Sequence, residues 1–374
     1  MIPKQLFERS LLDFFAPIRR FLDDPEVTEV MINGPSDVFV EREGRLTRTG
    51  AAFGTTQDLE AALRNLAQYV GRHFGPDRPI LEARFPDGSR VEAIMAPAAH
   101  DGPCVAIRRF SREPLTIARL IEVGALSRPA ADLLAALVAC KQNIVVAGGT
   151  SSGKTSVLNA LSSFIPVDER VVVIEDATEL QLQQPHVLRL EAQPSDSKGK
   201  GAVSVRELFR ATLRMRPDRI VVGEVRGGEA LDLVQAMTSG HGGCMTTVHA
   251  THSLDVVNRL ETLALMSDVE LPLYALRAQV ASAVDFIVHT ARLPDGTRCI
   301  TQISEVVGYE GDKGYRFTDL FVRRYDARGQ GGRSRSQLVP LGTLPRCTEL
   351  IVAMGLDLPP TMLEARERSK GARR

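Results

Sequence analysis

The sequence predicts an α/β protein in two parts: an N-terminal α+β domain and a larger domain with a mainly parallel sheet flanked by helices. Up to residue 112, short strand-like runs are joined by turn residues. Beyond residue 120, β-branched runs that are apolar on both faces alternate with helical segments, which is typical of a parallel sheet covered on both sides. A chain of 374 residues is long enough for two cores.

Residues 1–112 are expected to form the α+β domain. Residues 7–22 have the pattern of an amphipathic helix, which Pro17 is expected to kink or split. The later elements are predicted, in order, as a strand over 27–32, a strand pair over 38–49 turning at Glu43-Gly44, a helix over 56–73, a hairpin over 80–97 turning at Pro86-Asp87-Gly88, and a strand over 104–110. Residues 113–119 are predicted to be a linker.

Residues 120–374 are expected to form the second domain with a C-terminal extension. A capping box from Ser204 to Glu207 predicts the start of one helix. Loops are predicted at 195–202 and 326–337, and the charged tail from Glu364 is expected to fray. The parallel strands are predicted over residues 143–147, 170–176, 219–225, 243–250 and 285–291.

The sequence "GGTSSGKT" follows the strand predicted over residues 143–147 and precedes a predicted helix. It fits the phosphate-loop pattern G-x-x-x-x-G-K-[ST]. Glycines let successive backbone N–H groups point inward as an anion nest, and a lysine reaches the β- and γ-phosphates. A hydroxyl follows the lysine for Mg²⁺, and the helix N-terminus adds partial positive charge. The alternative is a glycine turn that binds nothing. The candidate binding residues are Gly148, Gly149, Thr150, Ser151, Ser152, Gly153, Lys154, Thr155 and Ser156.

Hydrolysis of a bound nucleotide needs a metal ligand and a group that orients water. Glu175 and Asp176 end one predicted strand, and Glu224 ends another. A parallel sheet presents these ends on the edge that carries the phosphate loop. By position alone, any one of them is equally an exposed strand-end acid. His241 and His249 bracket the predicted strand in "GHGGCMTTVHA", where structural and catalytic roles both remain open.

Two groups of arginines are further candidates for contact with phosphate. Arg206, Arg210 and Arg214 form an i, i+4, i+8 stripe, which is either a solvated helix face or a basic edge toward a neighbour. Arg84 and Arg90 flank the turn of the predicted 80–97 hairpin, where arginines usually only face solvent.

Composition limits the class of protein. Lys plus Arg and Asp plus Glu are both 46, so the net charge of zero does not favour a nucleic-acid partner. The five cysteines are spread without a C-x-x-C pair, so neither structural zinc nor disulfides are expected and a reducing cytoplasmic location is favoured. No apolar run approaches the roughly 20 residues of a membrane helix. Any membrane role would therefore be peripheral.

Four segments in this order resemble the secretion and pilus-assembly ATPases of bacteria. "GGTSSGKT" is similar to their Walker A loop, "VVVIEDATELQL" to their aspartate box, "RMRPDRIVVGEVRGGEALDLVQAM" to their Walker B segment and "TSGHGGCMTTVHA" to their histidine box. The resemblance extends from about Val27 to Gly311. Within the superfamily, "LPLYALRAQVASAVDFIVH" and "ISEVVGYEGD" resemble the CpaF type, which serves Tad (type IVb) pilus systems.

The resemblance implies a RecA-like ATPase domain, a ring-shaped homo-hexamer that uses ATP and Mg²⁺, and an inner-membrane platform protein as partner. It also implies residue roles. Lys154 and Thr155 would hold phosphate and Mg²⁺, Glu175 would activate water, and Glu224 would support Mg²⁺ as the Walker B acid. His249 would sense the γ-phosphate, with His241 as its companion. Arg84 and Arg90 would reach the γ-phosphate from the N-terminal domain, with Arg108 and Arg109 behind them.

Some features depart from the family pattern. Ser151 replaces the usual glycine of "GTGSGKT", and binding is expected to survive this change. The N-terminal domain is predicted to begin near the first residues, so we do not expect the long leader that many CpaF-type members carry. Residues 323–337 have no assigned role. Besides a pilus-assembly motor, the alternatives are a type IV secretion ATPase, a retraction motor, a RecA-like nucleic-acid motor and a scaffold that binds ATP with little turnover.

Overall fold

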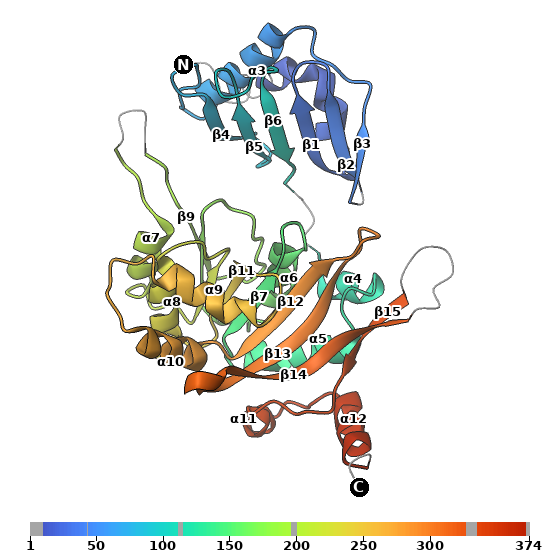
Figure 1. Cartoon of the computed structure of the whole chain (residues 1–374), viewed down its shortest axis with the longest axis vertical. Helices are drawn as coiled ribbons and strands as arrows, with labels where there is room; N and C mark the ends of the chain where they lie inside the picture. Colours follow the sequence, from blue (N-terminus) through green and yellow to red (C-terminus); the bar gives the residue numbers. More distant parts are fainter. Residues whose placement is uncertain (1–9, 43, 111–114, 196–199, 327–334, 372–374) are drawn as a thin grey trace. The chain divides into compact units, whose positions relative to one another are not determined.

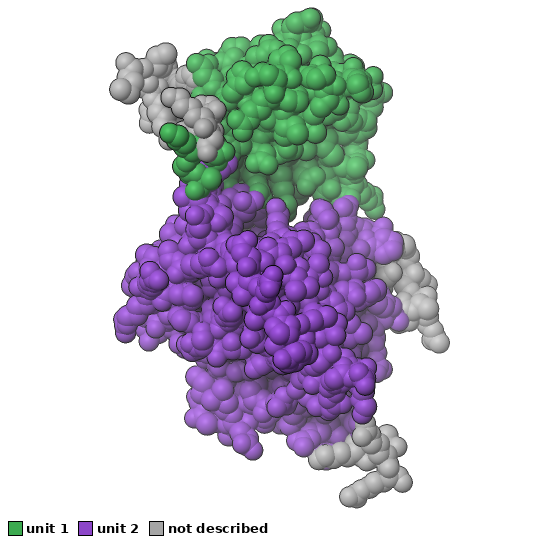
Figure 2. Space-filling view, turned by 60° about the vertical axis from the view of Figure 1, so that its left-hand side comes forward, with its two compact units in different colours: residues 1–113, 195–202 green, residues 114–194, 203–374 purple. Residues whose placement is uncertain are grey.

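The computed structural model describes residues 10–42, 44–110, 115–195, 200–326 and 335–371. The chain separates into two compact units, green and purple in Figure 2. The first comprises residues 1–113 with 195–202, and the second comprises residues 114–194 with 203–374. Each unit is considered by itself below.

The N-terminal unit is a six-stranded antiparallel sheet with helices, drawn in blue to teal in Figure 1. Helix α3 (Thr56–Tyr69) begins where the side chain of Thr55 accepts a hydrogen bond from the Asp58 backbone, and it buries Leu59, Leu63 and Leu66 in the core. The sheet order is β3-β2-β1-β6-β5-β4, with bounds β1 Val27–Asn33, β2 Val38–Arg42, β3 Arg45–Arg48, β4 Ile80–Arg84, β5 Arg90–Ile94 and β6 Cys104–Arg108.

The helix predicted over residues 7–22 is interrupted, as Pro17 indicated. A helical segment over residues 10–14 ends in a turn at Phe15, and η1 (Ala16–Ile18) and α2 (Arg19–Leu22) follow. Proline near the start of η1 removes a backbone donor, so the first helical segment cannot continue through it. Residues 7–9 and Glu43, at the turn of the predicted strand pair, lie outside the described residues.

The second unit is built on a nine-stranded sheet in the order β15-β14-β13-β12-β7-β11-β10-β8-β9. Strands β12 to β9 in this order run parallel, and β13, β14 and β15 are added antiparallel at one side. The bounds are β7 Ile144–Gly148, β8 Val171–Glu175, β9 Val187–Glu191, β10 Arg219–Val222, β11 Met245–His249, β12 Phe286–Arg292, β13 Arg298–Glu310, β14 Gly314–Asp326 and β15 Arg335–Pro340. The predicted α/β class is confirmed.

Helices cover both faces of this sheet because each buried strand is apolar on both sides. On β7, Ile144 and Val146 pack into one core with α5 and α6, whereas Val145 and Ala147 pack into a second core with α8 and α9. The helices are α4 Ile117–Glu122, α5 Arg128–Ala139, α6 Lys154–Ser162, α7 Val205–Thr212, α8 Glu229–Thr238, α9 Asp255–Ala264, α10 Leu273–Ala283, α11 Thr348–Ala353 and α12 Pro360–Gly371 (Figure 1).

Several sequence expectations for this unit were incomplete or wrong. Residues 117–119 of the predicted linker belong to α4, which Thr116 caps, and residues 113–114 lie outside the described residues. Residues 335–337, expected in a loop, belong to β15, which pairs with β14. Residues 364–371 are helical rather than frayed, because α12 buries Met362 in the core, and residues 372–374 lie outside the described residues. The predicted capping box at Ser204 is confirmed at the start of α7.

Among the described residues, no helix combines the length and the apolar character that crossing a membrane requires.

Candidate functional site

The phosphate-loop motif lies between the end of β7 and the start of α6. Gly153 caps α6 with φ +94, a left-handed conformation that favours glycine. A Cβ at Gly148 would lie 2.5 Å from the Ser152 hydroxyl and would also meet the Thr290 carbonyl. Glycine is therefore required at both ends of the loop. The loop leads into the N-terminus of a nine-residue helix, where backbone N–H groups favour an anion.

Strands β7, β11, β10 and β8 lie side by side in parallel, so their carboxyl ends share the edge that carries this loop. His249 ends β11 and pairs with Gly148 in register. Glu175 ends β8, and Glu224 follows β10 by two residues. The structure thus brings the loop and three of the predicted side chains to one edge of the sheet.

Lys154, His249 and Glu224 form a continuous polar chain across this edge. Lys154 Nζ donates to the Gly149 carbonyl at 2.9 Å and lies 3.3 Å from His249 Nδ1. His249 Nε2 lies 2.9 Å from Glu224 Oε1. Burial lowers the pKa of His249, with Glu224 opposing and Lys154 reinforcing that shift. A neutral imidazole accepts from the Lys154 ammonium through Nδ1. The 2.9 Å approach of Nε2 to Glu224 Oε1 is a close polar contact rather than a hydrogen bond, since that oxygen has no hydrogen-bond partner in the described part of the chain.

Glu175 is the most deeply buried acid of the site, at 4% exposure. Its Oε1 accepts hydrogen bonds from the backbone of Glu179 at 2.8 Å and Leu180 at 3.0 Å. Burial nevertheless outweighs these bonds and raises its pKa to about 7. A carboxyl with a pKa near neutrality suits general-base chemistry. The neighbouring Asp176 is exposed and lies 3.8 Å from Arg226, which fits the alternative of a strand-end surface acid.

A magnesium ion bound with nucleotide would find oxygen ligands here. Thr155 is the second residue of α6, beside Lys154, and the side chain of Glu224 is 19% exposed. Hydroxyl and carboxylate oxygens suit Mg²⁺, which takes its other ligands from phosphates and water. Among the described residues, no group of three or more His, Cys, Asp and Glu is placed to hold a metal by itself. Glu224 Oε2 accepts from Arg226 at 2.8 Å, so this carboxylate would have to exchange that cation for Mg²⁺ to act as its ligand.

Comparison with known proteins assigns the chain to a family. Residues 12–311 match the model of the type II/IV secretion system protein family. The chain belongs to this family. The type IV secretion system protein PtlH homolog of Bordetella bronchiseptica is 35% identical, over 73% of this chain and 87% of its own. The type IV secretion system protein VirB11 of Brucella suis is 34% identical, over 78% of this chain and 88% of its own.

A solved structure agrees in fold. The ATPase DotB of Legionella pneumophila matches with a TM-score of 0.54 and 16% identity, covering 80% of this chain and 81% of that chain. At 16% identity this likeness concerns the fold alone.

His241 is not brought to the cluster around Lys154. It lies four residues before β11, whereas the phosphate loop lies beyond the strand's other end. Five strand residues span about 17 Å, which separates the two edges of the sheet. The His241 carbonyl accepts from Cys244 Sγ at 3.0 Å, and its Nδ1 is buried. A joint role with His249 at one phosphate has no support from this subunit's geometry.

The candidate arginines of the N-terminal unit share one row of its sheet. Arg84 on β4 is paired with Arg90 on β5, and Arg90 is paired with Arg108 on β6. The row therefore brings three candidate cations to neighbouring positions of one sheet. Arg109 is different, because its guanidinium donates to the backbone carbonyls of Asp24 and Val27.

The arginine stripe of α7 serves packing. Arg206 donates to Asp232 at 2.8 Å and to Asp268 at 2.9 Å, and its side chain is only 16% exposed. Arg210 donates to the other oxygen of Asp232 at 2.7 Å. Arg206 therefore joins α7 to α8 rather than facing solvent, whereas the side chain of Arg210 stays 53% exposed while it contacts Asp232.

Sequence analysis missed two residues that contact the phosphate loop. Thr290 on β12 and Arg298 on β13 contact Ser152 and Ser151. No local motif marks them, since the contacts exist only because β12 lies beside β7.

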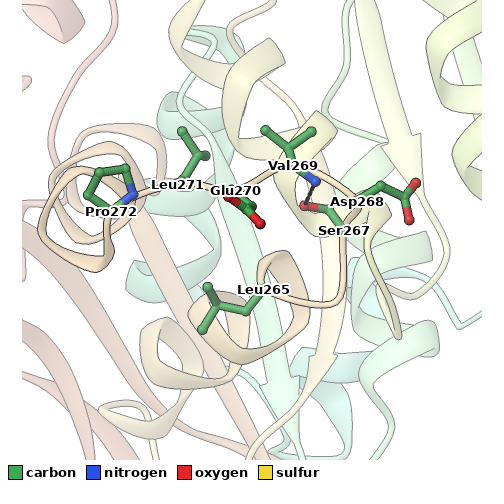
Figure 3. A pocket seen from close by; sticks show the side chains of 7 residues that line it. All are labelled: Leu265, Ser267, Asp268, Val269, Glu270, Leu271 and Pro272. Atoms are coloured by element: carbon green, nitrogen blue, oxygen red, sulfur yellow. Dashed lines mark hydrogen bonds between the residues drawn. The ribbon is translucent and has the colours of Figure 1, made fainter.

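A separate surface pocket lies on the loop between α9 and α10 (Figure 3). Its lining carries two acids, Asp268 and Glu270, and no cation, so it is unsuited to a polyphosphate. The lining residues are Leu265, Ser267, Asp268, Val269, Glu270, Leu271 and Pro272.

Proposed function

We propose that this protein is a hexameric motor that hydrolyses ATP with Mg²⁺ to drive a pilus-assembly or secretion apparatus at the inner membrane. The observation that carries the proposal is the Lys154–His249–Glu224 chain, which lies on the same sheet edge as the buried Glu175. A phosphate cradle, a metal-supporting acid and a base with a pKa near 7 are the parts that nucleotide hydrolysis needs.

The proposed residue roles are those that the family resemblance implies, and the shared sheet edge supports them. Gly148 to Ser156 form the phosphate cradle, in which Lys154 neutralises charge on the β- and γ-phosphates. Thr155 and Glu224 support Mg²⁺, directly or through water. Bound Mg²⁺ lowers the charge repulsion between the phosphates and an approaching nucleophile. Glu175 accepts a proton from the attacking water, and His249 responds to the γ-phosphate through Lys154.

Arg84 and Arg90 are assigned to the γ-phosphate of this subunit or the next one in the ring. Their support is the arginine row, which places Arg84, Arg90 and Arg108 at neighbouring register positions of one sheet. For His241 we propose a role only toward the nucleotide of a neighbouring subunit.

Within this function, the relatives' names and the sequence favour two systems. The segments at residues 271–289 and 303–312 favour a Tad or type IVb pilus, with extension and retraction both open. The matches named type IV secretion system protein favour a secretion channel instead. Co-purification with a polytopic inner-membrane platform protein supports the pilus system, and co-purification with a channel component supports secretion. The motor would stay cytoplasmic and reach the membrane through that partner.

The decisive experiment measures Mg²⁺-dependent ATP hydrolysis against protein concentration. Specific activity is expected to rise as rings assemble. Glu175→Gln is expected to abolish turnover while nucleotide binding persists, because glutamine accepts the same backbone hydrogen bonds but takes no proton. Asp176→Asn is the matched control, an exposed neighbouring acid that should leave turnover within about twofold.

Three outcomes contradict the proposal. Activity that is constant per subunit and survives Glu175→Gln removes both the ring and the role of Glu175. Binding of ATP without turnover in the unmodified protein indicates a nucleotide-regulated scaffold. Stimulation of hydrolysis by DNA or RNA points to a nucleic-acid motor.

A further inference from the structure

The hairpin of β12 and β13 holds the phosphate loop from the side away from β11. Thr290 Oγ1 donates to the Ala147 carbonyl at 3.0 Å and lies 2.8 Å from Ser152 Oγ. Arg298 Nε donates to the Ser151 carbonyl at 2.9 Å. Two consecutive loop residues are therefore held by side chains that lie outside the phosphate-loop motif.

Ser151 is the strained residue of this loop. Its φ is +56, whereas the loop's other left-handed positions, Gly148 and Gly153, carry no side chain. A residue with a Cβ pays a free-energy penalty in this conformation that glycine does not pay. The Arg298 bond is made to the carbonyl of this same residue. A guanidinium donor makes the bond charge-assisted and directional.

We infer that Arg298 is a positioning residue, which keeps Ser151 left-handed so that the loop is shaped for phosphate before nucleotide binds. The stem of Arg298 also lies against the loop, because a Cβ placed on Gly153 would be 3.9 Å from Arg298 Cβ and Cδ. Preorganisation of this kind raises affinity by removing the cost of ordering the loop on binding. The inference rests on the proposed function, in which this loop binds nucleotide.

The competing explanation is that Arg298 only adds positive charge near the phosphates. Arg292 offers the matched control, since it is paired with Arg298 in register across the same hairpin and is exposed. Arg292→Ala removes an equal charge. Arg298→Lys keeps the charge but lacks the planar Nε–H donor. A hydrogen-bond role predicts that Arg298→Lys behaves as Arg298→Ala, and a charge role predicts that it behaves as the unmodified protein.

The test measures the Kd of a fluorescent ADP analogue in the full chain, with the thermal unfolding midpoint as a check on folding. Arg298→Ala is expected to raise the Kd about tenfold, the effect of one charge-assisted hydrogen bond. Arg292→Ala should change it less than twofold. Ser151→Gly is expected to make the Kd much less dependent on Arg298. In that background, Arg298→Ala should raise the Kd only about twofold. A residue with a purely structural role would not be rescued by glycine at position 151.

The inference is overturned if Arg298→Ala raises the Kd equally in the unmodified protein and in Ser151→Gly. It is also overturned if Arg298→Ala leaves the Kd unchanged. Lys154→Ala separates this failure from failure of the proposed function: if Lys154→Ala and the unmodified protein bind equally poorly, the loop is not a nucleotide site. In that case amide hydrogen exchange of the nucleotide-free protein still tests the positioning role. Arg298→Ala should accelerate exchange in the segment 149–153, and unchanged exchange rejects the role.

Discussion

His249 Nε2 lies 2.9 Å from Glu224 Oε1, where the ends of two neighbouring parallel strands meet. The other ring nitrogen faces the ammonium of Lys154. A neutral imidazole in this position connects the two groups that nucleotide and Mg²⁺ are proposed to contact. Displacement of Lys154 toward a γ-phosphate would break one end of the chain, so the histidine can respond to the presence of that phosphate.

His249→Ala is expected to lower kcat by about 10- to 1,000-fold, the range seen when one preorganised polar group is lost from a transition state. The Kd for ADP should change less than about threefold, because His249 contacts Lys154 rather than a phosphate in the nucleotide-free protein, so its removal takes away no contact with ADP. Steady-state kinetics and ADP titration measure the two effects. His252→Ala, an exposed histidine three residues on, is the control. A large rise in Kd at unchanged kcat would assign His249 to ground-state binding.

Glu175 makes the stability of the nucleotide-free protein depend on pH. Its folded pKa of about 7 is above its ordinary value of 4.5, so its contribution is fully present below pH 4.5 and is lost as the pH rises through 7. The shift corresponds to at most about 3 kcal/mol. Glu175→Gln should therefore stay within about 1 kcal/mol of the unmodified protein's free energy of unfolding at pH 5 and exceed it by about 2–3 kcal/mol at pH 8.

Denaturant unfolding at the two pH values measures this difference. Asp176→Asn, which changes an exposed acid, should show the same pH dependence as the unmodified protein. If Glu175→Gln and the unmodified protein differ in free energy of unfolding by the same amount at pH 5 and pH 8, Glu175 does not take up a proton on folding.

The part of the site that could be predicted from sequence is the part encoded locally. The phosphate loop is contiguous, and Glu175 and Glu224 follow strands whose carboxyl ends must share an edge in a parallel sheet. The contact between His249 and Lys154 depends on β11 lying beside β7, which is a matter of strand order. His241 shows the limit of spacing alone, since a whole strand separates it from His249.

The fold shows the same division. The apolar parallel strands were predicted, but β13 and β14 were not, because they mix polar and apolar residues and are joined through η2 (Gly311–Lys313) rather than a two-residue turn. Helix α12 was missed because its charges dominate its composition, while its position depends on Met362 packing in a distant core. Arg298 and Thr290 were missed for the related reason that this hairpin was not foreseen.

The two adjacent glycines of the phosphate loop are expected to differ sharply in tolerance. Gly148→Ala places a Cβ 2.5 Å from Ser152 Oγ and against the Thr290 carbonyl, so the loop must shift. We expect nucleotide binding to be lost and the free energy of unfolding to fall by about 2 kcal/mol or more. At Gly149 a Cβ meets nothing within 4 Å. Gly149→Ala should therefore change the free energy of unfolding by less than about 0.5 kcal/mol and should still bind nucleotide. Equal behaviour of the two variants in thermal unfolding and ADP titration would contradict this loop geometry.

The arginine stripe of α7 can be tested through its acidic partners. Asp232 is 9% exposed and accepts from both Arg206 and Arg210, so Asp232→Ala leaves a half-buried guanidinium without its principal partner. The free energy of unfolding should fall by about 1–3 kcal/mol, with turnover per folded protein unchanged. Asp268, whose side chain is 92% exposed, accepts from the same Arg206, and Asp268→Ala should cost less than about 0.5 kcal/mol.

These two substitutions also decide between packing and an interface. If Asp232→Ala unfolds normally but fails to assemble or to hydrolyse ATP, the stripe acts on a neighbouring subunit and its ion pairs are secondary. If stability falls while assembly, measured by sedimentation, is retained, the arginines serve to join α7 to α8. The exposure difference between the two aspartates makes the second result the expected one, because solvent screens Asp268 far more than Asp232.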